Sequence, residues 1–144
     1  MSKSALPVLP CLCANLRRAS RALTQRYEEA MRPLNLTSSQ FTILQALTFT
    51  GEITQGRLGE ILFMDSTTLT RTLTIMRRNR WVTTRAGADR RERLLRLSKH
   101  GRVEFARAQP LWEQAQASVR AQLGDTRWEN LQSLVNEVTS VVTE

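Results

Sequence analysis

Residues 65–97 read DSTTLTRTLTIMRRNRWVTTRAGADRRERLLRL, and the first half of this segment has a helical pattern. Asp65 is a good helix N-cap, because its side chain can accept hydrogen bonds from the first free backbone N–H groups. Apolar side chains then recur at three- and four-residue steps, at Leu69, Leu73 and Met76. The sequence therefore predicts an amphipathic helix from Asp65 to about Asn79.

The second half of the segment has a β-type pattern. Residues 81–85 and 92–97 are short runs of β-branched and apolar residues, and the linking residues AGADRR favour a turn. A β-hairpin is therefore predicted at residues 81–97, directly after the helix.

Two short helices are predicted before residue 65. Thr37 and Gln40 have the spacing of a capping box, which opens a helix that Gly51 ends. Another helix is expected at about residues 54–62. Its inward-facing residues are expected to be Leu58 and Ile61.

Longer helices are predicted at both ends of the chain. An amphipathic pattern begins at about residue 9, has Pro10 in its first turn and continues to about residue 30. Ser98 is the expected cap of a long helix that bends at Pro110, and a last helix follows Gly124.

The central order of three helices and a hairpin is typical of the winged helix-turn-helix fold. The expected fold class is mainly α with a small β-hairpin wing, flanked by N- and C-terminal helices. Residues 1–144 are expected to form one domain, with a DNA-binding core at about 37–98 that includes the wing at 81–97. The major groove of a duplex admits an α-helix, and the wing can lie along the neighbouring backbone or minor groove.

Charge points to the same kind of partner. The formal net charge is +8, and eleven of the 21 Lys and Arg residues lie between Arg71 and Arg102, where the only acids are Asp89 and Glu92. These basic residues extend over a helix end, two strands and a turn, whereas a membrane-binding helix would carry them opposite one apolar face. The pattern favours a nucleic acid.

Other classes of protein are disfavoured. No apolar run is long enough to span a bilayer, and the proline-broken N-terminus is unlike a secretory signal, so a cytoplasmic protein without a membrane partner is expected. His100 is the only histidine, and no nucleophile set, metal-ligand cluster or phosphate-binding glycine loop is visible. We therefore expect no enzyme activity, no metal and no cofactor.

An ordered set of motifs resembles the multiple-antibiotic-resistance regulator (MarR) family over nearly the whole chain. The motifs are Leu36-Thr37-x-x-Gln40-Phe41-x-x-Leu44, Leu58-Gly-Glu60, Met64-Asp-Ser-Thr-Thr-Leu-Thr-Arg71, Asp89-x-Arg91 and Leu97-Ser-x-x-Gly101. The resemblance implies a dimeric winged-helix protein that binds a near-palindromic double-stranded operator, usually as a repressor released by a small ligand or an oxidant. Charge alone would also permit a less specific, architectural DNA-binding protein.

The resemblance also implies which side chains contact DNA. The first turns of the recognition helix would present hydroxyls and an arginine, while Arg91 would enter the minor groove and Asp89 would shape the wing tip. The predicted contact residues are Ser66, Thr67, Thr68, Thr70, Arg71, Asp89, Arg90, Arg91 and Arg93. Thr67 and Thr68 could instead serve only as local helix caps. The arginines could instead form a basic surface that contacts only solvent.

One position departs from the family pattern. The family usually has glycine just before the first wing strand, where this sequence has Arg80. Glycine relieves a left-handed backbone at such a position. We therefore expect Arg80 to shift that conformation to Asn79, or to alter the turn slightly.

The terminal helices, at about 9–32 and 99–144, are richer in apolar residues than a small winged-helix domain needs. In the resembling family they interlock across a two-fold axis, which places two recognition helices about 34–36 Å apart on the duplex. A homodimer is therefore expected, while part of the apolar surface serves the core of the chain itself.

Cys11 and Cys13 are the first candidates for regulation. Two cysteines without further ligands cannot complete a zinc site. The run Cys13-x-x-Leu16-x-x-Ala19-Ser20-Arg21-Ala22-x-Thr24-x-x-Tyr27 is similar to the first helix of the organic-hydroperoxide sensors (OhrR) of the same family. In those sensors the matching thiolate oxidises to sulfenic acid and DNA is released. The implied effector residues are Cys13, Cys11, Arg17 and Tyr27.

The chain also departs from those sensors. Of the tyrosines that surround their thiol only Tyr27 has a counterpart, and Arg17 and Ser38 take the places of others. No cysteine lies in the C-terminal half, so oxidation would end in a mixed disulfide with a small thiol, a bond between two N-termini or a higher acid. Cys11 could be a partner or a soft-metal co-ligand, and simple packing is the alternative for both thiols. A small aromatic or anionic ligand, received by Arg17, Arg21 and Tyr27, is the competing effector.

Overall fold

The computed structural model describes residues 5–144, and residues 1–4 of the predicted domain lie outside the described residues. It is mostly helical with one small antiparallel sheet, so the predicted fold class is confirmed. The elements in chain order are α1 (Leu12–Met31), the 3-10 turn η1 (Arg32–Leu34), α2 (Ser38–Thr50), β1 (Ile53–Thr54), α3 (Gln55–Leu62), α4 (Ser66–Arg78), β2 (Val82–Ala86), β3 (Arg93–Leu97), α5 (Lys99–Leu123) and α6 (Asp125–Thr143).

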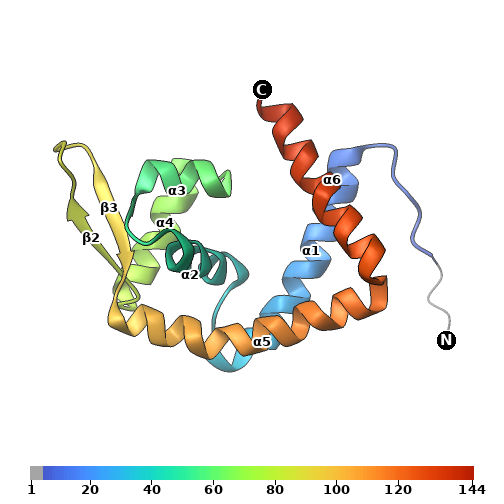
Figure 1. Ribbon diagram of the computed structural model, residues 1–144, viewed down its shortest axis with the longest axis horizontal. Coiled ribbons are helices and arrows are strands. Elements are labelled where there is room, and N and C mark those ends of the chain that lie inside the picture. Colours follow the sequence, from blue (N-terminus) through green and yellow to red (C-terminus); the bar gives the residue numbers. More distant parts are fainter. Residues whose placement is uncertain (1–4) are drawn as a thin grey trace.

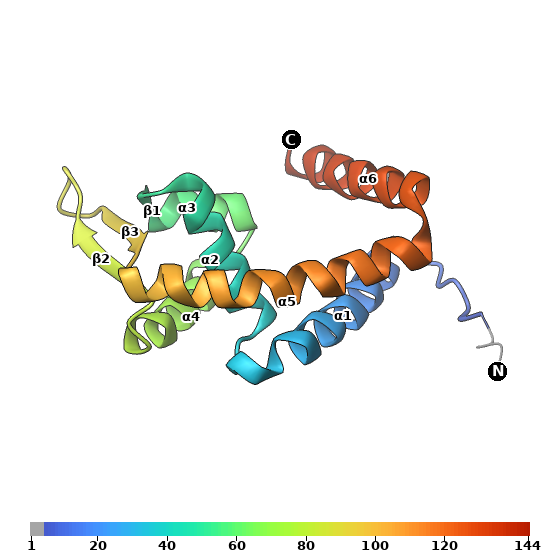
Figure 2. The ribbon, with the colours of Figure 1, turned by 60° about the horizontal axis from the view of Figure 1, so that its bottom comes forward.

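Helix α5 is the long axis of the molecule. The β2–β3 hairpin projects at one end of α5, and α1 and α6 lie toward the other end (Figure 1). In Figure 2, α6 extends from the far end of α5 and turns back along the molecule. Helix α5 thus joins the winged-helix unit to the terminal helices, and it is one continuous helix that includes Pro110. None of the helices within residues 5–144 is long and apolar enough to cross a membrane.

The core lies where α2, α3, α4 and the sheet meet the first half of α5. Leu44, Leu58, Leu73 and Leu95 are fully buried there. The predicted inner face of α4 is confirmed, since Leu69 and Met76 are buried beside Leu73.

The predicted inner face of α3 is only half right. Leu58 is buried, but Ile61 is 47% exposed. Because α3 has only eight residues, one narrow side of it reaches the core, and Leu62, one turn after Leu58, makes the second contact instead.

A third strand was not predicted. Strand β1 pairs with β3 so that Ile53 lies opposite Leu95 and Thr54 opposite Leu94, which gives the strand order β1-β3-β2. A two-residue strand is too short to show an alternation of apolar and polar residues, so the sequence pattern cannot predict it. Its pairing is set by the packing around it.

Capping fixes most of the helix starts. The predicted capping box is present, since the Gln40 N–H donates to Thr37 Oγ1 at 3.2 Å and the Thr37 N–H donates to Gln40 Oε1 at 3.1 Å. Asp65 caps α4 and Ser98 caps α5, as expected.

The first helix begins later than predicted. It starts at Leu12, with Cys11 as N-cap, so Pro10 lies outside it. The side-chain amide of Asn15 explains the difference, because it accepts from the Leu9 N–H at 3.1 Å and donates to the Leu9 carbonyl at 2.7 Å. These bonds hold the preceding segment in a non-helical conformation against the helix.

Of the two alternatives predicted for this turn, the shift of the left-handed conformation to Asn79 is wrong. Arg80 itself has φ 62°, while Asn79 has φ −77°. The Trp81 N–H donates to the Met76 carbonyl and the Arg80 N–H to the Arg77 carbonyl, at 3.0 and 2.9 Å. This pair of bonds is a Schellman motif, which requires the left-handed residue immediately after the C-cap, and that residue is Arg80.

Candidate nucleic-acid interface

The start of α4 is held by Asp65. The Thr68 N–H donates to Asp65 Oδ1 at 2.8 Å, and the Thr68 hydroxyl donates to Oδ2 at 2.7 Å. The hydroxyl bond is the main reason why the pKa of the Asp65 carboxyl lies below its ordinary value. The Thr68 hydroxyl therefore serves the cap, as the competing interpretation of this residue proposed.

The other predicted contact residues of α4 lie on its exposed side. Ser66, Thr67 and Arg71 are exposed in the first two turns. Thr70 is also exposed, and its hydroxyl accepts from Gln55 Nε2 of α3 at 3.0 Å. This face can thus offer hydroxyls, a guanidinium and the positive end of the helix dipole to an anionic partner.

Asp89 organises the tip of the wing. The Arg91 N–H donates to Asp89 Oδ1 at 3.1 Å, and the Glu92 N–H donates to the Asp89 carbonyl at 3.0 Å. A β-carbon on Gly87 would lie 2.8 Å from the β-carbon of Glu92, so a larger residue there would require the two strands to shift. The turn leaves the side chains of Arg90, Arg91 and Arg93 exposed.

A cleft of about 980 Å³ connects the wing to the helix-turn-helix. One face of α3, the start of α4 and the base of the wing tip form its walls. Among its lining residues are Gln55, Phe63, Ser66, Leu69, Arg91 and Arg93. Two predicted wing residues and one predicted recognition-helix residue therefore share one concave surface.

Side chains that the sequence analysis did not single out brace this surface. Arg77 Nη1 donates to Thr84 Oγ1 at 3.0 Å and ties the end of α4 to β2. Arg85 of β2 makes a two-point ion pair with Glu52, and its Nε lies 2.8 Å from Oε2. The Arg85 bond is the main reason why the pKa of Glu52 lies below its ordinary value.

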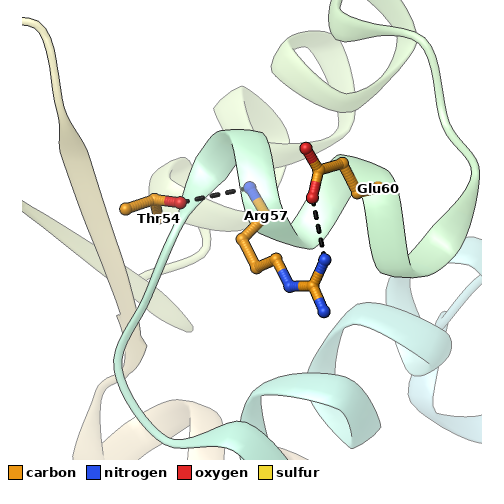
Figure 3. A network of polar contacts seen from close by, with 3 residues as sticks. All are labelled: Thr54, Arg57 and Glu60. Carbon is orange, nitrogen blue, oxygen red and sulfur yellow. Dashed lines mark hydrogen bonds and ion pairs between the residues drawn. The ribbon is translucent and has the colours of Figure 1, made fainter.

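Helix α3 has its own polar network (Figure 3). The Arg57 N–H donates to Thr54 Oγ1 at 3.1 Å, so Thr54 is the N-cap of the helix. The Arg57 guanidinium pairs with Glu60 at 2.9 Å on the exposed side. This pair satisfies part of the charge of Arg57, whereas no ion pair within residues 5–144 involves Arg90, Arg91 or Arg93.

The two cysteines lie at the start of α1. Cys11 is the N-cap, Cys13 is in the first turn, and both are exposed. Arg17 Nη2 lies 3.4 Å from Cys13 Sγ, so a positive charge is in contact with the thiol. Within residues 5–144, no group of three or more His, Cys, Asp and Glu side chains could hold a metal.

Tyr27 is not part of this thiol site within one chain. Its hydroxyl donates to Gln116 Oε1 of α5 at 3.3 Å, its ring packs against the core, and burial raises its pKa. Fourteen residues separate it from Cys13, which corresponds to about 21 Å along a helix. The structure thus brings Arg17 to Cys13 but directs Tyr27 toward α5.

Comparison with known proteins agrees with this geometry. Residues 34–92 match the MarR family. The chain is 36% identical to the Mycobacterium tuberculosis transcriptional regulator MosR, solved in complex with DNA, with a TM-score of 0.84 over 92% of this chain and 96% of that one.

Two Bacillus subtilis proteins are also similar. The HTH-type transcriptional regulator YwoH is 31% identical over 94 residues, 65% of this chain and 69% of that protein. The organic hydroperoxide resistance transcriptional regulator is 34% identical over 91 residues, 62% of this chain and 62% of that protein. The chain belongs to the MarR family of winged-helix transcriptional regulators.

Proposed function

We propose that this chain is a sequence-specific DNA-binding regulator that acts as a homodimeric repressor and is released from its operator by oxidation of Cys13 or by a small ligand. The observation that carries the DNA-binding part is the shared surface of α4 and the wing. There Ser66, Arg91 and Arg93 line one cleft, and Thr67 and Arg71 are exposed beside it. The likeness to the DNA-bound MosR structure supports the same surface.

The terminal helices support the homodimer. Helix α6 has no buried residue within the chain, although it carries an apolar stripe. Leu131, Leu134 and Val135 are 45%, 58% and 43% exposed on it. An apolar stripe of this kind is stable in water only when another surface covers it. A second copy is the proposed cover, because two recognition helices are needed to read a near-palindrome.

The experiment that tests DNA recognition starts from a randomised duplex library. The protein should enrich a near-palindromic sequence, which then serves as the probe. At physiological salt we expect the selected duplex to bind at least about 10³-fold more tightly than a scrambled duplex of the same length. A ratio near one would instead support the less specific, architectural DNA-binding protein.

The thiol part of the proposal rests on Cys13, its contact with Arg17 and its exposure. The Cys13 thiolate attacks one oxygen of an organic hydroperoxide, the O–O bond breaks, and the alcohol leaves after taking up a proton. The product is a Cys13 sulfenic acid, which a second thiol converts to a disulfide with loss of water. A small cellular thiol, or a cysteine at the partner's N-terminus, would supply that second sulfur.

Replacement of Cys13 tests this step directly. We expect Cys13→Ser to bind the selected duplex like the wild type, and to remain bound at a hydroperoxide concentration that releases the wild type. Arg17→Ala should keep the thiol but slow its oxidation, because the contacting positive charge is lost. Fluorescence anisotropy of the labelled duplex measures release, and mass spectrometry measures the sulfur product. A wild type that stays on DNA under peroxide at equal protein concentration would contradict the thiol mechanism.

A small aromatic or anionic ligand is the second candidate effector. The contacts of Tyr27 with Gln116 and of Arg26 with Ser118 join α1 to α5, so a ligand that disturbs these bonds would shift the two helices. Salicylate is a suitable first probe, because it is both aromatic and anionic. Release of DNA by salicylate from both the wild type and Cys13→Ser would favour this route.

A further inference from the structure

Gln55 is the first residue of α3, and its side chain reaches the recognition helix. Gln55 Nε2 donates to Thr70 Oγ1 at 3.0 Å. The Thr54 hydroxyl accepts from the Arg57 N–H and caps α3 (Figure 3). This cap fixes where α3 begins, and Gln55 is its first residue. Gln55 also lines the cleft that contains Arg91 and Arg93.

Thr70 differs from the neighbouring threonines of α4. Thr72 and Thr74 donate their hydroxyl protons to the carbonyls four residues earlier, at 3.0 and 2.8 Å. Thr68 donates its proton to Asp65. Among the hydrogen bonds of residues 5–144, the hydroxyl of Thr70 takes part only as the acceptor from Gln55. Its proton is therefore directed away from Gln55, on an exposed face of the helix.

We propose that Gln55 is a positioning residue for DNA recognition, which fixes the Thr70 hydroxyl as a hydrogen-bond donor toward the major groove. The inference rests on the proposed function and adds a specificity to it. A fixed donor fits base acceptors such as guanine N7 and O6, adenine N7 or thymine O4, and it is mismatched with the amino group of cytosine. Gln55 thus acts through Thr70 and need not contact a base.

The test is a double-mutant cycle on the duplex that the full-length wild type selects from a randomised library. Gln55→Ala should weaken binding to that duplex by about fivefold, in line with the loss of one oriented hydrogen bond. Binding to a scrambled duplex should change less than twofold, and the salt dependence should be unchanged, since no phosphate contact is lost. In a Thr70→Val background the same Gln55→Ala change should have no further effect.

A second variant reverses the hydrogen bond. In Gln55→Glu the carboxylate accepts the Thr70 proton, so Thr70 presents lone pairs to the groove. Library selection with this variant should move the preference at one symmetric pair of positions toward cytosine, whose amino group is a donor and which offers no acceptor to the wild-type hydroxyl. Thermal unfolding and circular dichroism of each variant check that the fold is retained.

The outcomes separate this inference from the proposed function. If Gln55→Ala weakens binding by the same factor with and without Thr70, or if Gln55→Glu selects the wild-type sequence, Gln55 does not act through Thr70 and the inference is overturned. If the wild type enriches no sequence at all, the proposed function fails and takes the inference with it.

Discussion

At the scale of single residues, the wing tip is a cluster of unneutralised positive charge. Within residues 5–144 no ion pair forms at Arg90, Arg91 or Arg93, whereas Arg57 and Arg85 are each paired with a glutamate. Guanidinium groups that are free of protein partners are attracted most strongly to the narrow minor groove or to phosphates. The wing arginines should therefore account for much of the salt dependence of DNA binding.

The variant Arg91→Ala measures that contribution. We expect affinity for the selected duplex to fall by about five- to tenfold, and the slope of log K against log salt to decrease by about one per protomer, because each contact releases roughly one counterion. Arg32→Ala removes an exposed arginine of the turn η1, which belongs neither to the wing and α4 nor to the apolar stripe of α6. It is the matched control and should change neither quantity. Unchanged affinity in Arg91→Ala would remove the wing from the DNA interface.

Arg80 is a residue-scale source of strain. Its φ of 62° is unfavourable for any residue with a β-carbon, and the Schellman motif at the end of α4 demands it. Arg80→Gly should stabilise the fold by about 0.5–1 kcal/mol, which corresponds to a rise in Tm of roughly 2–4 °C. Arg80→Ala, which loses the charge but keeps the strain, should show no such gain in thermal unfolding. Equal effects of the two variants would assign the change to the side chain instead of the backbone.

At the scale of elements, the residue just before β1 is joined to strand β2 of the wing by the Glu52–Arg85 ion pair. The Arg85 hydrogen bond lowers the pKa of Glu52 in the folded protein. The resulting stabilisation is present above the ordinary pKa of glutamate, near 4.5, and is lost as the pH falls through the lowered value. Protonation of Glu52 should therefore loosen the wing in acid.

The pH dependence of thermal unfolding checks this link. The Tm of the wild type should fall as the pH is lowered below about 4.5, and Glu52→Gln should fall less steeply over the same range because it has no proton to bind. The effect should be modest, since both side chains are partly exposed. Glu137→Gln removes an exposed acid of α6 and is the matched control, expected to follow the wild type. Parallel curves for wild type and Glu52→Gln would show that the ion pair does not support the wing.

At the scale of the whole molecule, the apolar stripe of α6 makes the proposed dimer testable. Leu131→Lys places a charge in the centre of the stripe, where burial against a second copy would be costly. We expect dimer dissociation to rise by at least about tenfold in sedimentation, together with a loss of operator binding. Ser133→Lys adds the same charge on the opposite, exposed side of α6 and should remain dimeric. A dimeric Leu131→Lys protein would exclude this face as the interface.

The sequence by itself determined the kinds and order of most elements, and it singled out the wing tip, the recognition helix and the two cysteines. These features depend on interactions between residues a few positions apart, such as the Thr37–Gln40 capping box and the Asp65 cap, and a linear pattern records such spacings.

Only the tertiary structure decided the pairing of β1 with β3, the left-handed backbone at Arg80, the outward side of Ile61 and the bond between Gln55 and Thr70. Each of these features depends on how separate elements pack against one another, or on which residue completes a motif. The local sequence is compatible with more than one outcome at each of these positions. The packing of α3, α4 and the sheet in three dimensions selects one of them, because buried surface and hydrogen bonds must be satisfied together.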